Sequence, residues 1–156
     1  MTQAPARQPE TAGGGLDSAF RVAIEVWIPS DVGYIERVVE IVRRQVAEMS
    51  FDARHVMLNV PVALTEALSN AILRGNREDP DKRVHIRASV TARQLVMEVR
   101  DEGRGFDIDR CMRDPTRPEN MEREDGRGLF LMRSLMDSVE RYDAEGNVVR
   151  LTLNRR

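Results

Sequence analysis

The sequence contains little cysteine, little net charge and no long apolar run, and each absence excludes a class of protein. Cys111 is the single cysteine among 156 residues, which rules out an intrachain disulfide, a zinc knuckle and an iron–sulfur site. A formal net charge of -2 gives no electrostatic reason to expect nucleic acid or an anionic membrane as a partner. No apolar run approaches the roughly 20 residues that span a bilayer, and the N-terminus lacks the apolar core of a signal peptide. We therefore expect a cytoplasmic protein.

Signatures of the common phosphate-binding enzymes are missing as well. The chain has no GxxxxGK phosphate loop, and it lacks the protein-kinase signatures built on H-R-D and D-F-G. The two histidines, His55 and His85, are isolated in the sequence, and nothing pairs either of them with a nucleophile. If this protein transfers phosphoryl groups, we expect it to do so on a different fold.

Length and composition predict one domain. A chain of 156 residues has the size of a single domain, and 41% hydrophobic with 32% charged residues is typical of a soluble globular protein. Residues 1–17 are rich in Ala, Gly, Pro and Gln and show no periodicity, so we expect a disordered tail there. Residues 18–156 are expected to form the domain.

Hydrophobic periodicity predicts the elements of this domain. The stretch FRVAIEVWIP alternates and predicts a strand that ends at Pro29. Ser30 can then cap a helix that runs to about Met49. A second helix is expected from about His55 to Arg74, and a third from about Arg127 to Asp137. Four further strands are expected at 83–90, 94–103, 138–143 and 147–153, with a loop at 107–126.

The order of these elements predicts the fold class. It reads strand, helix, helix, two strands, loop, helix, two strands, which lacks the regular alternation of a parallel βαβ sheet. We therefore expect an α/β (α+β) two-layer sandwich, in which helices pack on one face of a mixed or antiparallel sheet.

The first candidate site lies in the second helix, in the stretch LTEALSNAILRGN. Glu66 and Asn70 are four positions apart, so their side chains lie one turn apart on the same face of the helix. A carboxylate beside an amide suits Mg²⁺, which takes oxygen ligands. Glu66 could then accept a proton from an attacking hydroxyl. Taken alone, such a pair is also common on the exposed surface of a helix.

The second candidate site is the stretch DEGRGF, directly after an apolar strand. Asp101, at the strand end, can accept a hydrogen bond from an exocyclic amino group such as that of adenine. Gly103 and Gly105 allow backbone conformations and a close ligand approach that a Cβ would forbid. A plain glycine turn is the alternative interpretation of this motif.

The third candidate site is the stretch DGRGLFLMRSLMD. Gly126 and Gly128 flank Arg127 where the third helix is expected to begin. A helix N-terminus presents free N–H groups and a positive dipole end to a phosphate, and Arg127 could add a cationic contact. An ordinary transition from loop to helix would have the same pattern, and the apolar residues that follow, Leu129 first, are expected in the core.

The order and spacing of the three motifs resemble a known pattern. E-x-x-x-N on a helix, D-x-G-x-G after a strand, a variable loop and G-x-G opening a helix resemble the Bergerat ATP-binding fold of the GHKL superfamily. That superfamily includes gyrase B, MutL, heat-shock chaperones and sensor histidine kinases. The stretches LTEALSNAILRGN, VRDEGRGFD and GRGLFLMRSLMD resemble one branch, the RsbW-like anti-sigma factor serine kinases. The resemblance covers about residues 20–154.

This resemblance implies roles for the motif residues. Asn70 would ligate Mg²⁺, Glu66 would be the general base, and Asp101 would hold the adenine of ATP. Beneath a lid formed by the loop, the remaining contacts to ATP would come from Gly103 and Gly105 around the adenine, and from Arg104, Gly126, Arg127, Gly128 and Leu129 at the phosphates.

Two positions depart from the family pattern. Relatives usually have His before the Gly-Asn pair that ends the second helix, whereas this chain has Arg74. This difference concerns the tuning of the base rather than nucleotide binding. Relatives often begin the last strand with Gly-Thr, whereas this chain has Gly146-Asn147, which can alter a polar contact near the adenine.

The function implied by the resemblance is that of a cytoplasmic switch protein. Such a protein binds ATP and Mg²⁺, sequesters a sigma factor, and phosphorylates a Ser or Thr on a small anti-sigma factor antagonist; the family also allows a homodimer. Two alternatives stay open: a nucleotide-gated binding switch without phosphotransfer, and a stand-alone histidine-kinase-like ATPase domain. Against the latter, we expect no phospho-acceptor helix pair before the domain. A chaperone- or gyrase-type ATPase would need a transducer domain, for which 156 residues leave no room.

Overall fold

A five-stranded sheet forms one layer of the protein, for which the computed structural model describes residues 20–103 and 124–156. The strand order is β1-β2-β3-β5-β4, and each neighbouring pair is antiparallel. The sheet is therefore the antiparallel one of the two predicted forms. The alternating pattern predicts all of its strands, which are β1 (Arg21–Pro29), β2 (Arg83–Thr91), β3 (Gln94–Asp101), β4 (Ser138–Asp143) and β5 (Asn147–Asn154).

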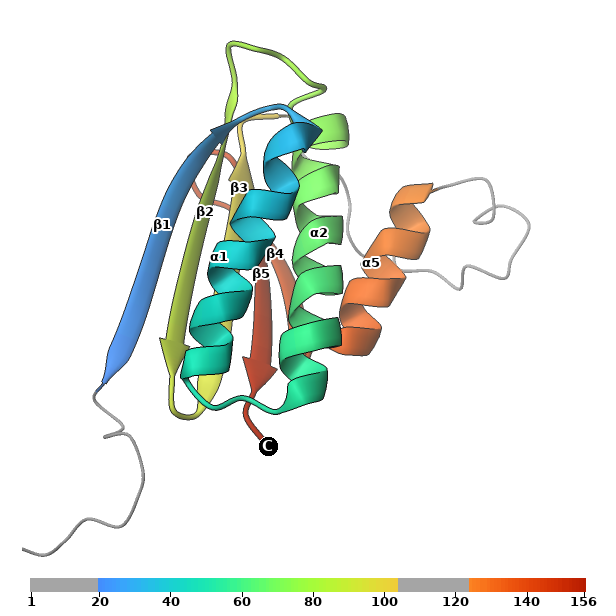
Figure 1. Ribbon diagram of the computed structural model, residues 1–156. Helices are drawn as coiled ribbons and strands as arrows, with labels where there is room; N and C mark the ends of the chain where they lie inside the picture. Colours follow the sequence, from blue (N-terminus) through green and yellow to red (C-terminus); the bar gives the residue numbers. More distant parts are fainter. Residues whose placement is uncertain (1–19, 104–123) are drawn as a thin grey trace, which may run out of the picture.

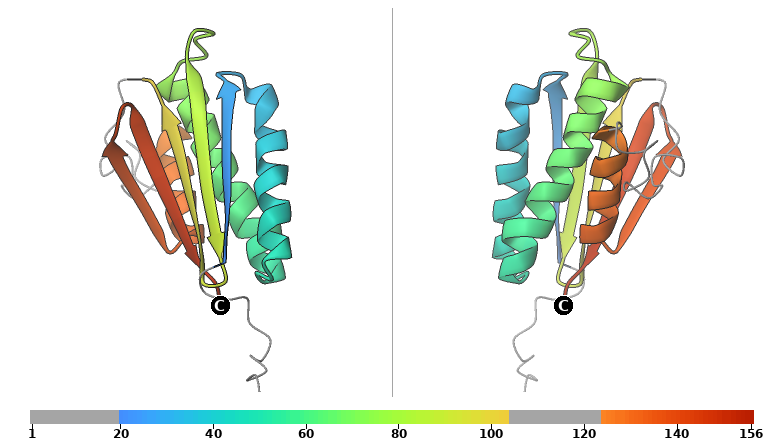
Figure 2. Two further views of the ribbon diagram at one scale, coloured as in Figure 1. Left: turned by 90° about the vertical axis from the view of Figure 1, so that its left-hand side faces the viewer. Right: turned by 90° about the vertical axis from the view of Figure 1, so that its right-hand side faces the viewer.

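Helices form the second layer and cover one face of this sheet (Figures 1 and 2). They are α1 (Ile35–Glu48), α2 (Val60–Asn70) and α5 (Glu124–Leu135). Two wider π-helical turns, η2 (His55–Asn59) and η3 (Ala71–Gly75), extend α2 at its two ends, which gives the long second helix that the sequence predicts. The predicted two-layer α+β architecture is confirmed.

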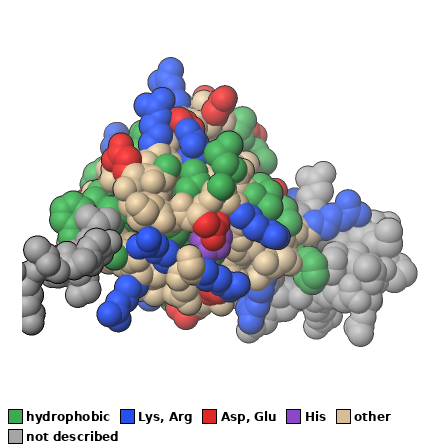
Figure 3. Space-filling view, turned by 60° about the horizontal axis from the view of Figure 1, so that its bottom comes forward, with side chains coloured by type: hydrophobic (Ala, Val, Ile, Leu, Met, Phe, Trp, Pro, Cys, Tyr) green, Lys and Arg blue, Asp and Glu red, His purple; other side chains and the backbone are tan. Residues whose placement is uncertain are grey.

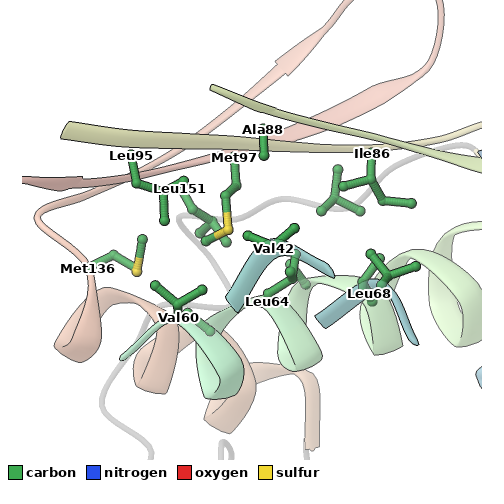
Figure 4. Packing of buried hydrophobic residues seen from close by; sticks show 14 of the residues in the cluster. Val42, Val60, Leu64, Leu68, Ile86, Ala88, Leu95, Met97, Met136 and Leu151 are labelled. Atoms are coloured by element: carbon green, nitrogen blue, oxygen red, sulfur yellow. The ribbon is translucent and has the colours of Figure 1, made fainter. Parts of the chain in front are cut away.

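Side-chain alternation along β3 and β5 determines where the core ends. The inward residues of these strands are apolar and buried: Leu95, Met97, Val99, Leu151 and Leu153. Leu95, Met97 and Leu151 point toward the helical layer (Figure 4). Because side chains alternate along a strand, Asp101 and Asn147 lie on this same inward face. The two residues are direct cross-strand partners, and both are buried. A polar pair therefore closes the core at the end of β3.

The predicted cap of the first helix is wrong. Asp31 caps instead, since its Oδ1 accepts a hydrogen bond of 2.8 Å from Gly33 N, and a 3-10 turn, η1 (Val32–Tyr34), precedes α1. Ser30 is 5% exposed, and its hydroxyl donates to the Lys82 carbonyl oxygen at 2.7 Å. A buried hydroxyl needs partners, and those of Ser30 lie far along the chain: Lys82, on the segment before β2, and Asn76, at the end of the second helix.

The third helix also begins earlier than predicted. It starts at Glu124 rather than Arg127 and ends at Leu135 rather than Asp137, so the pair Gly126 and Gly128 lies within the helix. Several predictions fall outside the described residues: the tail at 1–17, Cys111, Arg104, Gly105 and most of the loop at 107–126.

One helix satisfies the length and composition of a membrane span, which the sequence analysis did not expect. It runs from His55 to Gly75, and its most apolar window has a mean hydropathy of 1.4. Within the protein, 56% of that window is buried. Its apolar residues Leu64, Leu68 and Ile72 are fully buried in the core. The helix is apolar because it is the core helix under the sheet.

Candidate functional site

Two helices bring a carboxylate, an amide and a glycine together. Glu66 is half-buried on α2, and Asn70 lies one turn further along and is 7% exposed. α5 packs beside α2 so closely that a Cβ on Gly128 would lie 2.5 Å from Glu66 Oε2 and 3.7 Å from Asn70 Nδ2. Only glycine leaves the Glu66 carboxylate where it is. Three of the predicted site residues therefore share one location.

The amide of Asn70 has an open bonding position. No described residue is hydrogen-bonded to its buried Nδ2. Burying an unpaired polar atom costs free energy, so such an atom is normally satisfied by water, an ion or a ligand. The nitrogen and oxygen of an amide exchange places by rotation about one bond, so the amide can present its oxygen to a cation. Together with the Glu66 carboxylate, this donor set fits Mg²⁺.

The first turn of α5 supplies a different kind of group. The N–H groups of a first helical turn have no helical acceptor, and Gly126 lies in that turn. Arg127, in the next position, is exposed. The side chain of Leu129 is fully buried, as the core interpretation predicts, so this residue can reach a ligand only through its backbone. Free N–H groups beside an arginine can bind an anion.

The two carboxylate oxygens of Asp101 have different hydrogen-bond surroundings. It is 4% exposed, and its Oδ1 accepts hydrogen bonds from Gly103 N at 2.8 Å and from Asn147 Nδ2 at 3.0 Å. No described residue donates to Oδ2. A Cβ on Gly75 would lie 2.3 Å from Oδ2, so the glycine that ends η3 keeps side-chain atoms away from this oxygen. Oδ2 of Asp101 is therefore the oxygen that could accept a hydrogen bond from an amino group, and the role of Asp101 in holding adenine stays a prediction.

The close approach at Gly103 is one of backbone to backbone. A Cβ on this residue would lie 1.9 Å from the Gly75 carbonyl oxygen. The sequence predicts that this glycine admits a ligand, whereas its nearest neighbour is the end of η3. Gly103 therefore joins the end of β3 to the end of the core helix, where Asp101 lies beside Gly75.

Asn76 is a residue of the site's framework that the sequence analysis treated only as part of a helix stop. It is 1% exposed, and its Nδ2 donates to Ser30 Oγ at 3.0 Å and to the Arg83 carbonyl oxygen at 2.9 Å. Its Oδ1 accepts from Glu102 N at 2.7 Å. One side chain thus ties the end of the core helix to the ends of three strands. The Gly-Asn pair was the available signal, but it does not reveal these distant partners.

The opposite end of the domain contains none of the predicted site residues that the structure describes. Lys and Arg side chains are spread over that end (Figure 3). A shallow cavity of about 660 Å³ opens there, lined by Ala92, Arg93, Gln94, Asn154, Arg155 and Arg156. It lies at the start of β3, whereas Asp101 ends that strand. Among the described residues, no three His, Cys, Asp or Glu side chains form a metal cluster. Mg²⁺ usually takes one or two protein ligands together with water and phosphate oxygens, so Asn70 does not need such a cluster.

Comparison with known proteins gives a consistent result. Residues 28–153 match the family model described as the histidine kinase-like ATPase domain. The chain is 30% identical over 134 residues to the serine-protein kinase RsbW of Bacillus subtilis (strain 168), covering 83% of each chain. It is 39% identical over 95 residues to the anti-sigma F factor of Heyndrickxia coagulans, covering 56% of this chain and 63% of the relative.

Proposed function

The chain belongs to the histidine kinase-like ATPase family, and on that premise we propose that it is an ATP-dependent serine kinase that acts as a cytoplasmic anti-sigma factor. It binds a sigma factor, and it transfers a phosphoryl group to a Ser or Thr of a small antagonist protein. The names of its relatives, a serine-protein kinase and an anti-sigma F factor, support both parts. The structural observation that carries the proposal is the close approach of Gly128 to Glu66 and Asn70, which leaves no room for a Cβ beside the Glu66 carboxylate.

In this proposal ATP lies between the end of β3 and the first turn of α5. Asp101 accepts a hydrogen bond from the adenine amino group through Oδ2, the oxygen to which no described residue donates. The phosphates lie at the N-terminus of α5, near the backbone of Gly126 in its first turn and the side chain of Arg127. Gly128 and Leu129 follow in the next turn, close to the phosphates. Arg104 at the phosphates and Gly103 with Gly105 at the adenine complete the proposed contacts.

The chemical step uses the two polar residues of α2. Asn70 would hold Mg²⁺ together with phosphate oxygens, and the ion would supply positive charge that stabilises the transferred phosphoryl group. Glu66 accepts the proton of the attacking hydroxyl. The hydroxyl oxygen forms a bond to the γ-phosphorus while the bond to the bridging oxygen breaks, and ADP leaves.

The test is a measurement of phosphoryl transfer with a matched pair of variants. The small protein that co-purifies with this chain is incubated with Mg-ATP, and its intact mass is followed over time. Glu66→Gln is compared with Glu36→Gln, which changes an exposed glutamate in the first turn of α1. We expect one added phosphoryl group with the wild type and with Glu36→Gln, and a rate at least about 100-fold lower with Glu66→Gln.

Two other outcomes have distinct meanings. Equal rates for all three proteins would remove Glu66 from the role of base. No transfer by the wild type, with ATP still changing how the partner is retained, would replace the kinase by the nucleotide-gated binding switch. Light scattering of the chain without its partner tests the homodimer that the family allows.

A further inference from the structure

Asn147, where this chain departs from the family pattern, has a fixed orientation. It is 6% exposed at the start of β5. Arg141 Nη2 donates a hydrogen bond of 2.9 Å to Asn147 Oδ1. A guanidinium group has no acceptor atom, so the atom facing Arg141 must be the amide oxygen. The amide nitrogen of Asn147 therefore faces the other way, toward β3.

The amide nitrogen uses both of its hydrogens on the turn that follows Asp101. It donates to Asp101 Oδ1 at 3.0 Å and to the Gly103 carbonyl oxygen. Asp101 Oδ1 also accepts from Gly103 N at 2.8 Å. A carboxylate oxygen has two lone pairs available for hydrogen bonds, so these two donors saturate Oδ1. Among the residues that the structure describes, none donates to Oδ2, so this oxygen is the open acceptor of Asp101 toward them.

We propose that Asn147 is a base-selecting residue of the nucleotide site, because it restricts Asp101 to one acceptor and thereby favours adenine over guanine. The inference rests on the proposed ATP site and names a further residue of that site. Adenine presents one amino group, at N6, beside the acceptor N1. A single carboxylate oxygen satisfies that amino group.

Guanine presents a different edge, which one acceptor cannot satisfy. If guanine took the position of adenine, its O6 would face Oδ2, so two acceptors would meet. If it shifted, its two donors, N1–H and the 2-amino group, could pair with the two oxygens of a free carboxylate. Oδ1 has no lone pair left for the second donor. One donor of guanine would be buried without a partner, which costs affinity.

The test compares nucleotide dissociation constants in the purified protein. ATP, GTP and ITP are titrated into the wild type, Asn147→Ala, Asn147→Thr and the control Asn154→Ala, which changes an exposed residue at the other end of β5. ITP keeps N1–H but lacks the 2-amino group. We expect the wild type to bind ATP about 100-fold more tightly than GTP. In Asn147→Ala this ratio falls about tenfold, GTP gains relative to ITP, and Asn154→Ala keeps the wild-type ratio.

The other possible outcomes each support or overturn the role of Asn147 in base selection. If Asn147→Ala weakens all three nucleotides equally, Asn147 is only structural and the inference is overturned. If Asn147→Ala does not fold, Asn147→Thr, which retains one donor, must show an intermediate ratio. Equal binding of ATP and GTP by the wild type overturns base selection but leaves the ATP site. No binding of ATP by the wild type overturns the proposed function, and this inference with it.

Discussion

Gly128 and Glu66 touch across the contact between α5 and α2, and a Cβ on residue 128 would lie 2.5 Å from Oε2 of the glutamate. The atom that would be displaced is the far end of a flexible side chain. An alanine at this position therefore costs little stability, but it moves the carboxylate. A substitution at residue 128 can therefore disturb the chemistry of the site while leaving the packing of α5 intact.

Gly128→Ala should therefore reduce activity without unfolding the protein. Alanine favours a helix over glycine by up to about 1 kcal/mol, so the free energy of unfolding should change by no more than that. A base displaced by about 1 Å lowers the rate of transfer about 100-fold. Ser134→Ala, on the exposed side of the same helix, should change neither quantity. An unchanged transfer rate in Gly128→Ala would mean that the position of Glu66 does not limit the chemical step.

Asp101→Asn should weaken ATP binding because it replaces one of the two carboxylate oxygens, Oδ2. Oδ1 can be retained as the amide oxygen, which still accepts from Gly103 N and Asn147 Nδ2. Oδ2 is then replaced by an NH₂ group, which faces the adenine amino group as a second donor. We expect the dissociation constant for ATP, measured by calorimetric titration, to rise about 10- to 100-fold. The melting temperature measured without nucleotide serves as the control, and unchanged ATP affinity would place adenine elsewhere.

The sequence predicted the strands well because they repeat one simple pattern. Alternation with period two identifies β1 to β5 wherever one face is buried. The start of α1 could not be predicted in the same way. Ser30 and Asp31 are both good cap residues, and the choice between them depends on Lys82 and Asn76, which lie far along the chain. Local patterns do not contain such partners.

The candidate site was predictable in part. The spacing of Glu66 and Asn70 places both on one face of a helix, and the end of a strand identifies Asp101. Their proximity to Gly128 follows from the packing of α5 on α2, which periodicity does not determine. The resemblance to a family supplied that link. The saturation of Asp101 by Asn147 required coordinates, because it depends on a strand pairing across more than forty residues.

Asn76→Ala should destabilise the whole domain. The substitution removes three hydrogen bonds at a residue that is 1% exposed, and it leaves Glu102 N and the Arg83 carbonyl oxygen without this partner. Unpaired buried groups of this kind cost about 1–3 kcal/mol each, so we expect a loss of about 2–4 kcal/mol in urea unfolding. Asn154→Ala, an exposed control, should cost less than about 0.5 kcal/mol. A loss as small as that of the control would show that water replaces the Asn76 amide.

Asp137 should make stability depend on pH at acidic values. Asn154 N donates to its Oδ2 at 2.6 Å and Arg156 Nη2 to its Oδ1 at 2.9 Å, and these bonds, that of Asn154 first, hold the pKa of Asp137 below its usual 3.8. A lowered folded-state pKa means that the carboxylate stabilises the fold at pH values above 3.8, and that this contribution is lost as the pH falls through the folded-state pKa.

Asp137→Ala should consequently be less stable than the wild type by about 1–2 kcal/mol at pH 7. The difference should shrink as the pH falls from 3.8 toward the lowered folded-state pKa, because the unfolded wild type then binds a proton that the folded protein does not. Urea unfolding of both proteins between pH 7 and pH 3 measures it. Asp143→Ala provides the control, since the Asp143 side chain is 77% exposed and lies 3.5 Å from Arg141 Nη2. A difference between wild type and Asp137→Ala that stays constant over this range would assign the loss to packing rather than to the charge of Asp137.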